Sequence, residues 1–269
     1  MNTLEVRKIK VTRLGHAMYL LSSRMNKNYL IDPFFDLNPG CPKEFITEEF
    51  FHTIDAVFLT HGHFDHTSGL QKMMVVNPQL LVVAPYELAM ILLQKGFQNI
   101  FPLNLGGSIP LEDVNVTMVP AKHSSSFGET EGTPIYAGEA SGYVFEFTDG
   151  PTLYHSGDTA LSYDLKLIDE LYKPNVAILS SSGQFTMGPR EAAYAIRNFL
   201  NVDVVIPSHT FPTTDTATSR ESYEQLLQAF PVVRNMEDRD QEFEKLLRDY
   251  DRTEVVVLGY GETYDVQLK

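Results

Sequence analysis

The sequence has one cysteine, no tryptophan and a shortage of basic residues. Because Cys41 has no partner within the chain, an intrachain disulfide is excluded, and so is a zinc finger, whose ligands include two or more cysteines. The 21 Lys and Arg residues are outnumbered by 35 Asp and Glu residues, so the net charge is −14. The basic residues form no run, and a polyanion would be repelled, so we expect no long nucleic acid as a partner.

Long apolar runs are missing as well. No stretch approaches the ~18 residues that a membrane helix requires, and no apolar segment follows a basic N-terminal region as in a signal peptide. No linker rich in Pro, Gly and Ser and no low-complexity tract interrupts the chain. We therefore expect a cytoplasmic protein that has no membrane partner and folds as a single domain over residues 1–269.

Several histidines lie together in one short motif, THGHFDH at residues 60–66, which also contains a carboxylate. The apolar run DAVFL at residues 55–59 precedes it and predicts a buried strand. The motif therefore begins where this strand ends, which is the end at which α/β proteins form their sites. Imidazole nitrogens and carboxylate oxygens are ligands that suit zinc, manganese and iron(II). The motif thus indicates a metal site.

The spacing within the motif suits two adjacent metal ions. His61 and His63 are two residues apart, so their side chains project to the same side of an extended segment and can reach one ion. Gly62 between them has no side chain to crowd that ion. Asp65 and His66 come after the turn and can point at a second position. A polar loop with solvated histidines is the alternative, but it explains a single histidine better than this cluster.

Three further predicted strands end beside a residue that can bind a metal ion. They are the alternating run at residues 114–120 before His123, the run from residue 152 that leads through Gly157 to Asp158, and the run at residues 202–208 before His209. This recurrence is stronger evidence than any one of the three, and it predicts the rest of the ligands.

Together these motifs resemble the metallo-β-lactamase superfamily over nearly the whole chain. Its pattern is Thr-His-x-His-x-Asp-His, then a distant histidine, then Gly-Asp-Thr, then a late histidine. The phrases LGHA at 14–17, IDPF at 31–34 and FTMGP at 185–189 resemble its small bacterial and archaeal metal-dependent hydrolases, which are related to the ascorbate-6-phosphate lactonase group. The resemblance implies an α/β fold, the four-layer αββα sandwich, with the ligands along one edge between the two sheets.

The resemblance also implies which residues hold two divalent metal ions. The first ion would be held by His61, His63 and His123, the second by Asp65, His66 and His209, and Asp158 would bridge them. Asp65 and Asp158 would be the catalytic residues, because Asp65 can orient the attacking water or accept its proton and Asp158 sets the spacing of the ions. Zinc is the first expectation, with manganese, iron or nickel as alternatives, because the same ligands accept all of them.

Local patterns predict the remaining helices and strands. We expect strands at residues 8–14, 18–22, 28–32, 80–84, 176–180 and 255–258, and helices at residues 68–75, 85–95, 164–172, 189–200, 219–230 and 237–250.

Other residues near these motifs have two interpretations. His16 either contacts the site or is structural, and His155 is more often structural. Asp32 ends a predicted strand and is expected to order the loop under the site by accepting hydrogen bonds, while the serines at 124–126 are expected near its mouth. The charged segment at 231–251 predicts a solvated helix, and the alternative is a contact in a homo-oligomer.

The resemblance implies a hydrolase in which a hydroxide that bridges two metal ions attacks a small ester, lactone or phosphoester. The acidic charge and the absence of a basic run favour a small molecule as substrate. A phosphodiesterase or nuclease of the same superfamily would predict a basic channel. A di-iron redox protein would usually need a flavin domain or partner, and a non-catalytic binding protein would have no need of every ligand.

Overall fold

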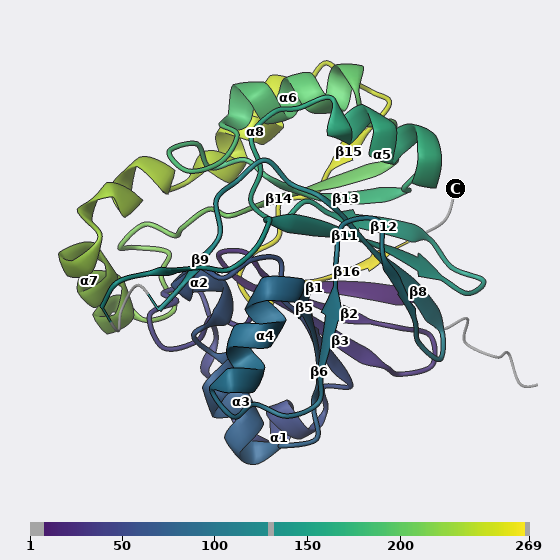
Figure 1. Cartoon of the computed structure of the whole chain (residues 1–269). Helices are drawn as coiled ribbons and strands as arrows, with labels where there is room; N and C mark the ends of the chain where they lie inside the picture. Colours follow the sequence, from purple (N-terminus) through teal and green to yellow (C-terminus); the bar gives the residue numbers. More distant parts are fainter. Residues whose placement is uncertain (1–7, 129–131, 267–269) are drawn as a thin grey trace, which may run out of the picture.

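Strands and helices alternate along most of the chain, and the strands form two seven-stranded sheets (Figure 1). The computed structural model describes residues 8–128 and 132–266. The two sheets face each other across an apolar core, and helices cover both outer faces, which makes four layers. The αββα sandwich predicted from the sequence is confirmed.

The first sheet combines strands from both ends of the described chain. Its order is β16 (Thr263–Val266), β1 (Ile9–Gly15), β2 (Met18–Ser22), β3 (Asn28–Ile31), β4 (Ala56–Phe58), β5 (Leu81–Pro85) and β6 (Ile100–Leu103). The pairs from β16 to β3 are antiparallel and those from β3 to β6 are parallel. The outer face is covered by α1 (Glu48–His52), α3 (Leu70–Val76) and α4 (Tyr86–Gln94), at the bottom of Figure 1.

The second sheet repeats this plan, with antiparallel pairs followed by parallel pairs. Its order is β15 (Glu254–Val255), β14 (Val204–Ser208), β13 (Val176–Ser180), β12 (Thr152–His155), β11 (Ser141–Phe147), β8 (Val114–Pro120) and β7 (Ser108–Pro110). Its outer face is covered by α5 (Asp164–Tyr172), α6 (Pro189–Asn198) and α8 (Arg239–Leu247), at the top of Figure 1.

Strand residues are buried on both faces because each sheet lies between two apolar layers. In β2, Tyr19 and Leu21 point into the core between the sheets, whereas Met18 and Leu20 pack under the helices. This alternation follows from the two-residue period of a strand. It explains why strands such as β2 and β13 have nearly continuous apolar sequences.

Short elements lie at the sheet edge where β4, β8, β12 and β14 end. They are α2 (Phe64–Thr67), β9 (Ser126–Phe127), β10 (Ile135–Tyr136), α7 (Arg220–Ala229) and the 3₁₀ helix η2 (Pro231–Met236), while a second 3₁₀ helix, η1 (Lys43–Phe45), precedes α1. None of the helices in the described part of the chain is long and apolar enough to cross a membrane.

Most of the expected helices and strands are observed within a few residues, and α5 and β13 have the predicted bounds. The strand predicted at 255–258 is an exception, because β15 ends at Val255. The chain then leaves the second sheet and crosses to the first, where β16 pairs with β1. The sequence did not predict β16, because its pairing depends on a strand at the other end of the chain.

The prediction of a solvated helix at 231–251 is confirmed only in part, because α8 is a helix whose charged residues are mostly exposed, while an apolar side of the segment is buried. Val233 and Met236 of η2 and Phe243 and Leu247 of α8 are buried. The sequence pattern did not reveal this apolar side, because the segment consists of a 3₁₀ helix followed by an α-helix. No single helical period therefore runs through its apolar residues. These four residues therefore belong to the core and to the edge where the site forms.

A buried ion pair connects α8 of this segment to β1 of the first sheet and to the chain that follows β14 of the second sheet. Arg13 on β1 donates from Nη1 to Asp240 Oδ2 on α8 at 2.5 Å and to the carbonyl of Leu258 at 2.9 Å. Its Nη2 donates to Thr210 Oγ1 at 2.6 Å, and that hydroxyl donates to Asp240 Oδ1 at 2.6 Å. The network thus fixes the chain directly after β14, and Tyr260 covers the guanidinium.

Breaking this pair should destabilise the fold strongly. We expect Asp240→Ala to lower the free energy of unfolding by about 3–5 kcal/mol, because Arg13 is then left buried without a counter-charge. Urea denaturation followed by circular dichroism measures the effect. Asp265→Ala breaks the exposed pair with Lys8 and serves as the control, with a change below about 1 kcal/mol. Equal losses in the two variants would contradict this account of Arg13.

Candidate metal centre

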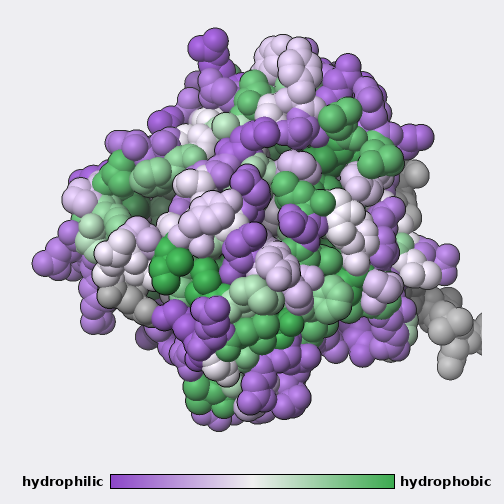
Figure 2. Space-filling model, viewed as in Figure 1, coloured by the Kyte–Doolittle hydropathy of each residue, from purple (hydrophilic) through white to green (hydrophobic). Residues whose placement is uncertain are grey.

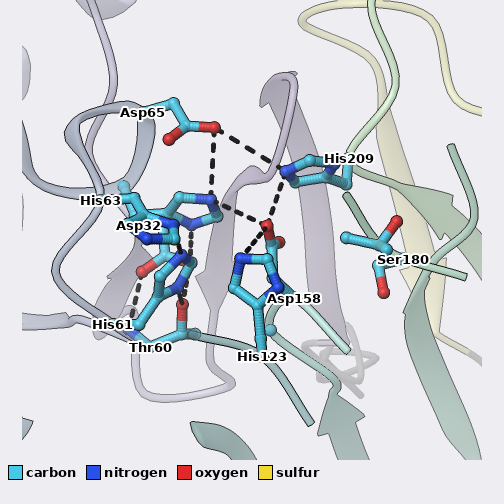
Figure 3. A network of polar contacts seen from close by, with 12 residues as sticks. Asp32, Thr60, His61, His63, Asp65, His123, Asp158, Ser180 and His209 are labelled. Atoms are coloured by element: carbon cyan, nitrogen blue, oxygen red, sulfur yellow. Dashed lines mark hydrogen bonds and ion pairs between the residues drawn. The ribbon is translucent and has the colours of Figure 1, made fainter. Parts of the chain in front are cut away.

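The ends of four strands bring the predicted ligands to one edge of the sandwich (Figure 3). The motif at 60–66 follows β4, His123 follows β8, Asp158 follows β12 and His209 follows β14. Gly62 must lack a side chain, because a Cβ there would lie 2.5 Å from the carbonyl oxygen of Ser126. The backbone of the motif can therefore lie directly against the segment around β9.

Three imidazoles form a first group. Ring nitrogens of His61, His63 and His123 lie within 4.8 Å of one another. His61 Nε2 and His63 Nδ1 are 2.9 Å apart. The two atoms are thus at hydrogen-bond distance, and they would separate by about 0.5 Å to bind one tetrahedral zinc ion, whose nitrogen ligands are about 3.4 Å apart.

A second group lies beside the first and contains one more residue than the predicted set. His16, Asp65, His66 and His209 place ligand atoms within 4.8 Å of one another. The additional residue is His16, whose Nε2 lies 3.0 Å from Asp65 Oδ2 and whose ring stacks on Phe211. Of the two interpretations of His16, contact with the site is therefore confirmed.

Asp158 lies between the two groups. Its Oδ2 is 2.7 Å from His209 Nε2 and 3.5 Å from His66 Nε2 in the second group, and 3.6 Å from His123 Nε2 in the first. Gly157 makes this position available, since its φ of +56° is in the left-handed region and a Cβ would lie 2.2 Å from the carbonyl oxygen of Ser141. Figure 3 shows the carboxylate between His123 and His209.

The buried atoms of this cluster suit divalent cations. His66 Nε2, His209 Nε2 and Asp158 Oδ1 are buried and make no hydrogen bond of acceptable geometry. His209 Nε2 and Asp158 Oδ2 approach to 2.7 Å, yet the angles of a hydrogen bond are not met. Nitrogen and oxygen donors that converge in this way without bonding each other fit a shared positive ion, so the residues present fit the metal ions that the motif implies.

Oxygen atoms behind the rings orient three of the imidazoles. His66 Nδ1 lies 2.8 Å from Asp32 Oδ2, and His61 Nδ1 lies 3.0 Å from the Thr60 hydroxyl, which itself donates to Asp32. His209 Nδ1 lies 3.0 Å from the Ser182 hydroxyl. An imidazole that donates from Nδ1 presents the lone pair of Nε2, so these contacts select the tautomer that binds a metal.

Asp32 has the role predicted for it. Its Oδ1 accepts the backbone N–H of Thr60 at 2.8 Å, and its Oδ2 accepts the Thr60 hydroxyl at 2.7 Å. The contacts that Thr60 and Ser182 make with the rings are not predicted from the sequence. A hydroxyl directly before the histidine motif was the available signal for Thr60, whereas Ser182 meets His209 only through the parallel pairing of β13 and β14.

The carboxylates raise the pKa values of two imidazoles in the second group. Burial lowers the pKa of His66, but Asp158, Asp65 and Asp32 outweigh it and raise the pKa well above its ordinary value. In His209, burial is likewise outweighed by Asp158 and Asp65, and the pKa rises to about 9. Burial raises the pKa values of Asp65 and Asp158, but the imidazoles outweigh it and hold both well below the ordinary range.

The first group is different, because burial dominates there. It lowers the pKa of His61 well below its ordinary value, and it also lowers the pKa of His123. Both rings are therefore neutral at pH 7 and present lone pairs, which is the form that binds metal ions.

The remaining candidates lie outside the two groups. His155 is buried, and its Nδ1 accepts the N–H of Gly157 at 3.1 Å, so it is structural and supports the turn before Asp158. Ser124 and Ser126 line the pocket over the centre, as predicted, whereas Ser125 is buried and holds the N–H of Gly62. Cys41 is buried, and burial raises the pKa of its thiol to about 12, so it is an unreactive thiol.

Comparisons with known proteins agree with this geometry. A family model described as Beta-lactamase superfamily domain matches residues 27–210. A UPF0173 metal-dependent hydrolase from Koribacter versatilis is 39% identical over 212 residues, which cover 78% of this chain and 88% of that protein. One from Methanopyrus kandleri is 37% identical over 259 residues, which cover 96% of this chain and 100% of that protein.

A solved structure extends the similarity to three dimensions. Igni18, a metallo hydrolase from the archaeon Ignicoccus hospitalis, superimposes with a TM-score of 0.76 at 27% identity, over 97% of this chain and 100% of that chain. Two mixed sheets with flanking helices, a cluster of histidine and aspartate side chains, and these matches lead to one assignment. The chain belongs to the UPF0173 metal-dependent hydrolases of the β-lactamase superfamily.

Proposed function

We propose that this metal-dependent hydrolase is dinuclear and uses a hydroxide between two divalent cations to cleave a small ester, lactone or phosphoester. The observation that carries the proposal is the position of Asp158, whose Oδ2 lies within 3.6 Å of imidazole nitrogens from both groups. One carboxylate that reaches two sets of donors suits a bridge between two ions. We propose zinc for both, because nitrogen donors are in the majority.

The cations would lower the pKa of a bound water toward about 7 and polarise the bond that is attacked. The protein side chains prepare the site for this chemistry. Asp158 sets the distance between the two groups, and Asp65, kept ionised by the surrounding imidazoles, can hold or accept a proton of the attacking water. His16 in turn orients Asp65 through its Nε2.

The net charge supports a small-molecule hydrolase over a nuclease, and the donor set is compatible with it. The net charge of −14 opposes the polyanion that a nuclease binds. The donor set is rich in nitrogen, and nitrogen suits a zinc hydrolase at least as well as a di-iron redox protein. The cytoplasmic location, the possibility of a homo-oligomer and the relation to the ascorbate-6-phosphate lactonase group stay predictions.

Removing a ligand should remove the metal. We expect His61→Ala and Asp158→Ala each to lose bound metal and to abolish hydrolysis of p-nitrophenyl esters and phosphodiesters, while circular dichroism stays unchanged. Elemental analysis by mass spectrometry gives the metal content. His52→Ala is the control, because His52 is an exposed histidine on α1 outside both groups. Full metal content and activity in Asp158→Ala would refute its assignment as a bridge.

The Ser182 hydroxyl, which contacts His209 Nδ1, should contribute to metal affinity. We expect Ser182→Ala to weaken metal binding about 10–100-fold, because His209 loses the acceptor that selects its tautomer. Titration against a chromophoric chelator measures the affinity. Ser181→Ala is a matched control, since the neighbouring Ser181 hydroxyl is buried and makes no hydrogen bond. Equal effects of the two substitutions would show that Ser182 does not act through His209.

Metal binding should release protons. In the metal-free protein His209, with a pKa of about 9, and His66 are protonated at pH 7, so cations must displace these protons. We expect release of about two protons per loaded centre and an affinity that falls as the pH falls from about 9, by about tenfold per unit for each displaced proton. Calorimetry in buffers of different ionisation enthalpy counts the protons. A release near zero would contradict the raised pKa values.

A further inference from the structure

A pocket of about 360 Å³ lies over the metal centre. Its floor consists of residues of the two metal groups. Its wall, called the apolar wall below, is formed by Phe64, Phe211, Leu226, Phe230, Val233 and Met236. Phe185 stands at the mouth and is 52% exposed. In Figure 2, hydrophobic surface recedes into a hollow on the left of the molecule, near the place of α7 in Figure 1.

Contacts between distant segments hold the apolar wall in place. The rings of Phe64 and Phe230 stack with centroids 4.8 Å apart. The N–H of Phe211 donates to the carbonyl of Met236 at 3.1 Å, so η2 is attached to the chain that follows β14. Asn235 donates to the side chain of Gln184 at 3.0 Å, next to Phe185. The wall is therefore a built surface and not a chance exposure of apolar residues.

The pocket offers little to a charged or strongly polar group. Among its described lining residues there is no lysine or arginine, and the only carboxylates are Asp65 and Asp158 of the metal centre. The other polar residues in this described lining are His63, His123 and His209 of the metal centre and the two serines Ser124 and Ser126. A phosphate or carboxylate on the far side of a substrate would lose its hydration without gaining a partner, whereas an apolar group would gain by leaving water.

We propose that the apolar wall binds an uncharged aliphatic or aryl chain, and that the substrate is a carboxylic ester or lactone that carries such a chain. This inference rests on the proposed hydrolytic function. In the reaction the oxygen of water bonds to the carbonyl carbon and the bond to the ester oxygen breaks. That oxygen leaves with a proton, so one ester and one water become a carboxylic acid and an alcohol.

Most residues of the apolar wall lie in a different part of the sequence from the predicted metal ligands. All residues of the predicted metal set lie within residues 27–210, the span that matches the family model. Five of the six wall residues, from Phe211 to Met236, lie after that span. The segment that determines the substrate is thus attached to the metal-binding domain through Phe211, two residues after His209.

Ligands that share one head group test the proposal directly. Hexanoate, adipate and gluconate each present a carboxylate on a six-carbon chain, but adipate adds a distal charge and gluconate adds hydroxyls. We expect hexanoate to bind the zinc-loaded protein at least tenfold more tightly than the other two, as measured by titration calorimetry. From acetate to hexanoate the affinity should rise about three- to fourfold per methylene. Equal affinities, or tighter binding of adipate or gluconate, would overturn the proposal.

A matched pair of phenylalanines locates the effect. Phe230 is 37% exposed in the wall, and Phe101 is 39% exposed on β6, outside the pocket lining. We expect Phe230→Ala to reduce the ratio of hexanoate to acetate affinity about tenfold, because the chain loses an aromatic contact. Phe101→Ala should leave that ratio unchanged. An unchanged ratio in Phe230→Ala would show that the chain binds elsewhere.

A second readout separates this inference from the proposed function. Hydrolysis of p-nitrophenyl acetate, butyrate and hexanoate should show the same rise per methylene in kcat/KM. If esters are cleaved but neither binding nor kcat/KM depends on chain length, the apolar wall is not the substrate site. If hexanoate binds as expected but no ester, lactone or phosphoester is cleaved, the proposed function fails and the assignment of the wall to an apolar chain holds.

Discussion

The buried carboxylate of Asp32 is the contact on which the geometry of the metal centre depends. It accepts hydrogen bonds from Thr60, which orients His61, and from His66. One side chain at the end of β3 therefore orients an imidazole in each of the two groups. Because Asp32 is fully buried, these bonds form in a medium of low polarity and are correspondingly strong.

The same low polarity raises the free energy of the folded protein when no cation is bound at the centre. Eight imidazole and carboxylate side chains are crowded together, and several of their atoms lack a hydrogen bond. The carboxylates raise the pKa values of His66 and His209, so protons on these rings partly compensate the carboxylates when no cation is bound. Tight packing on the Arg13–Asp240 network stabilises the chain beside His209, so the rest of the fold offsets the cost of the centre.

Chemistry and selectivity are provided by different parts of the chain. The two sheets supply the metal residues at the ends of their strands, as in other α/β folds. The pocket wall is added by α7 and η2, which follow the last metal residue and pack against α2. A change in that segment can alter the substrate while the metal centre keeps its geometry.

From the sequence alone, short apolar strands predicted that residues able to bind a metal ion meet at one edge, and the resemblance to the metallo-β-lactamase superfamily implied the fold class and the metal set. The sequence also determined most helices and strands, whose periods are local. Only the tertiary structure decided that His16 contacts Asp65, that Ser182 orients His209, and that the apolar residues of the segment 231–251 are buried. These three depend on residues far apart in the chain, so no local pattern of apolar and polar residues encodes them. The apolar wall is of the same kind, since it exists only where α2, the chain after β14, α7 and η2 meet.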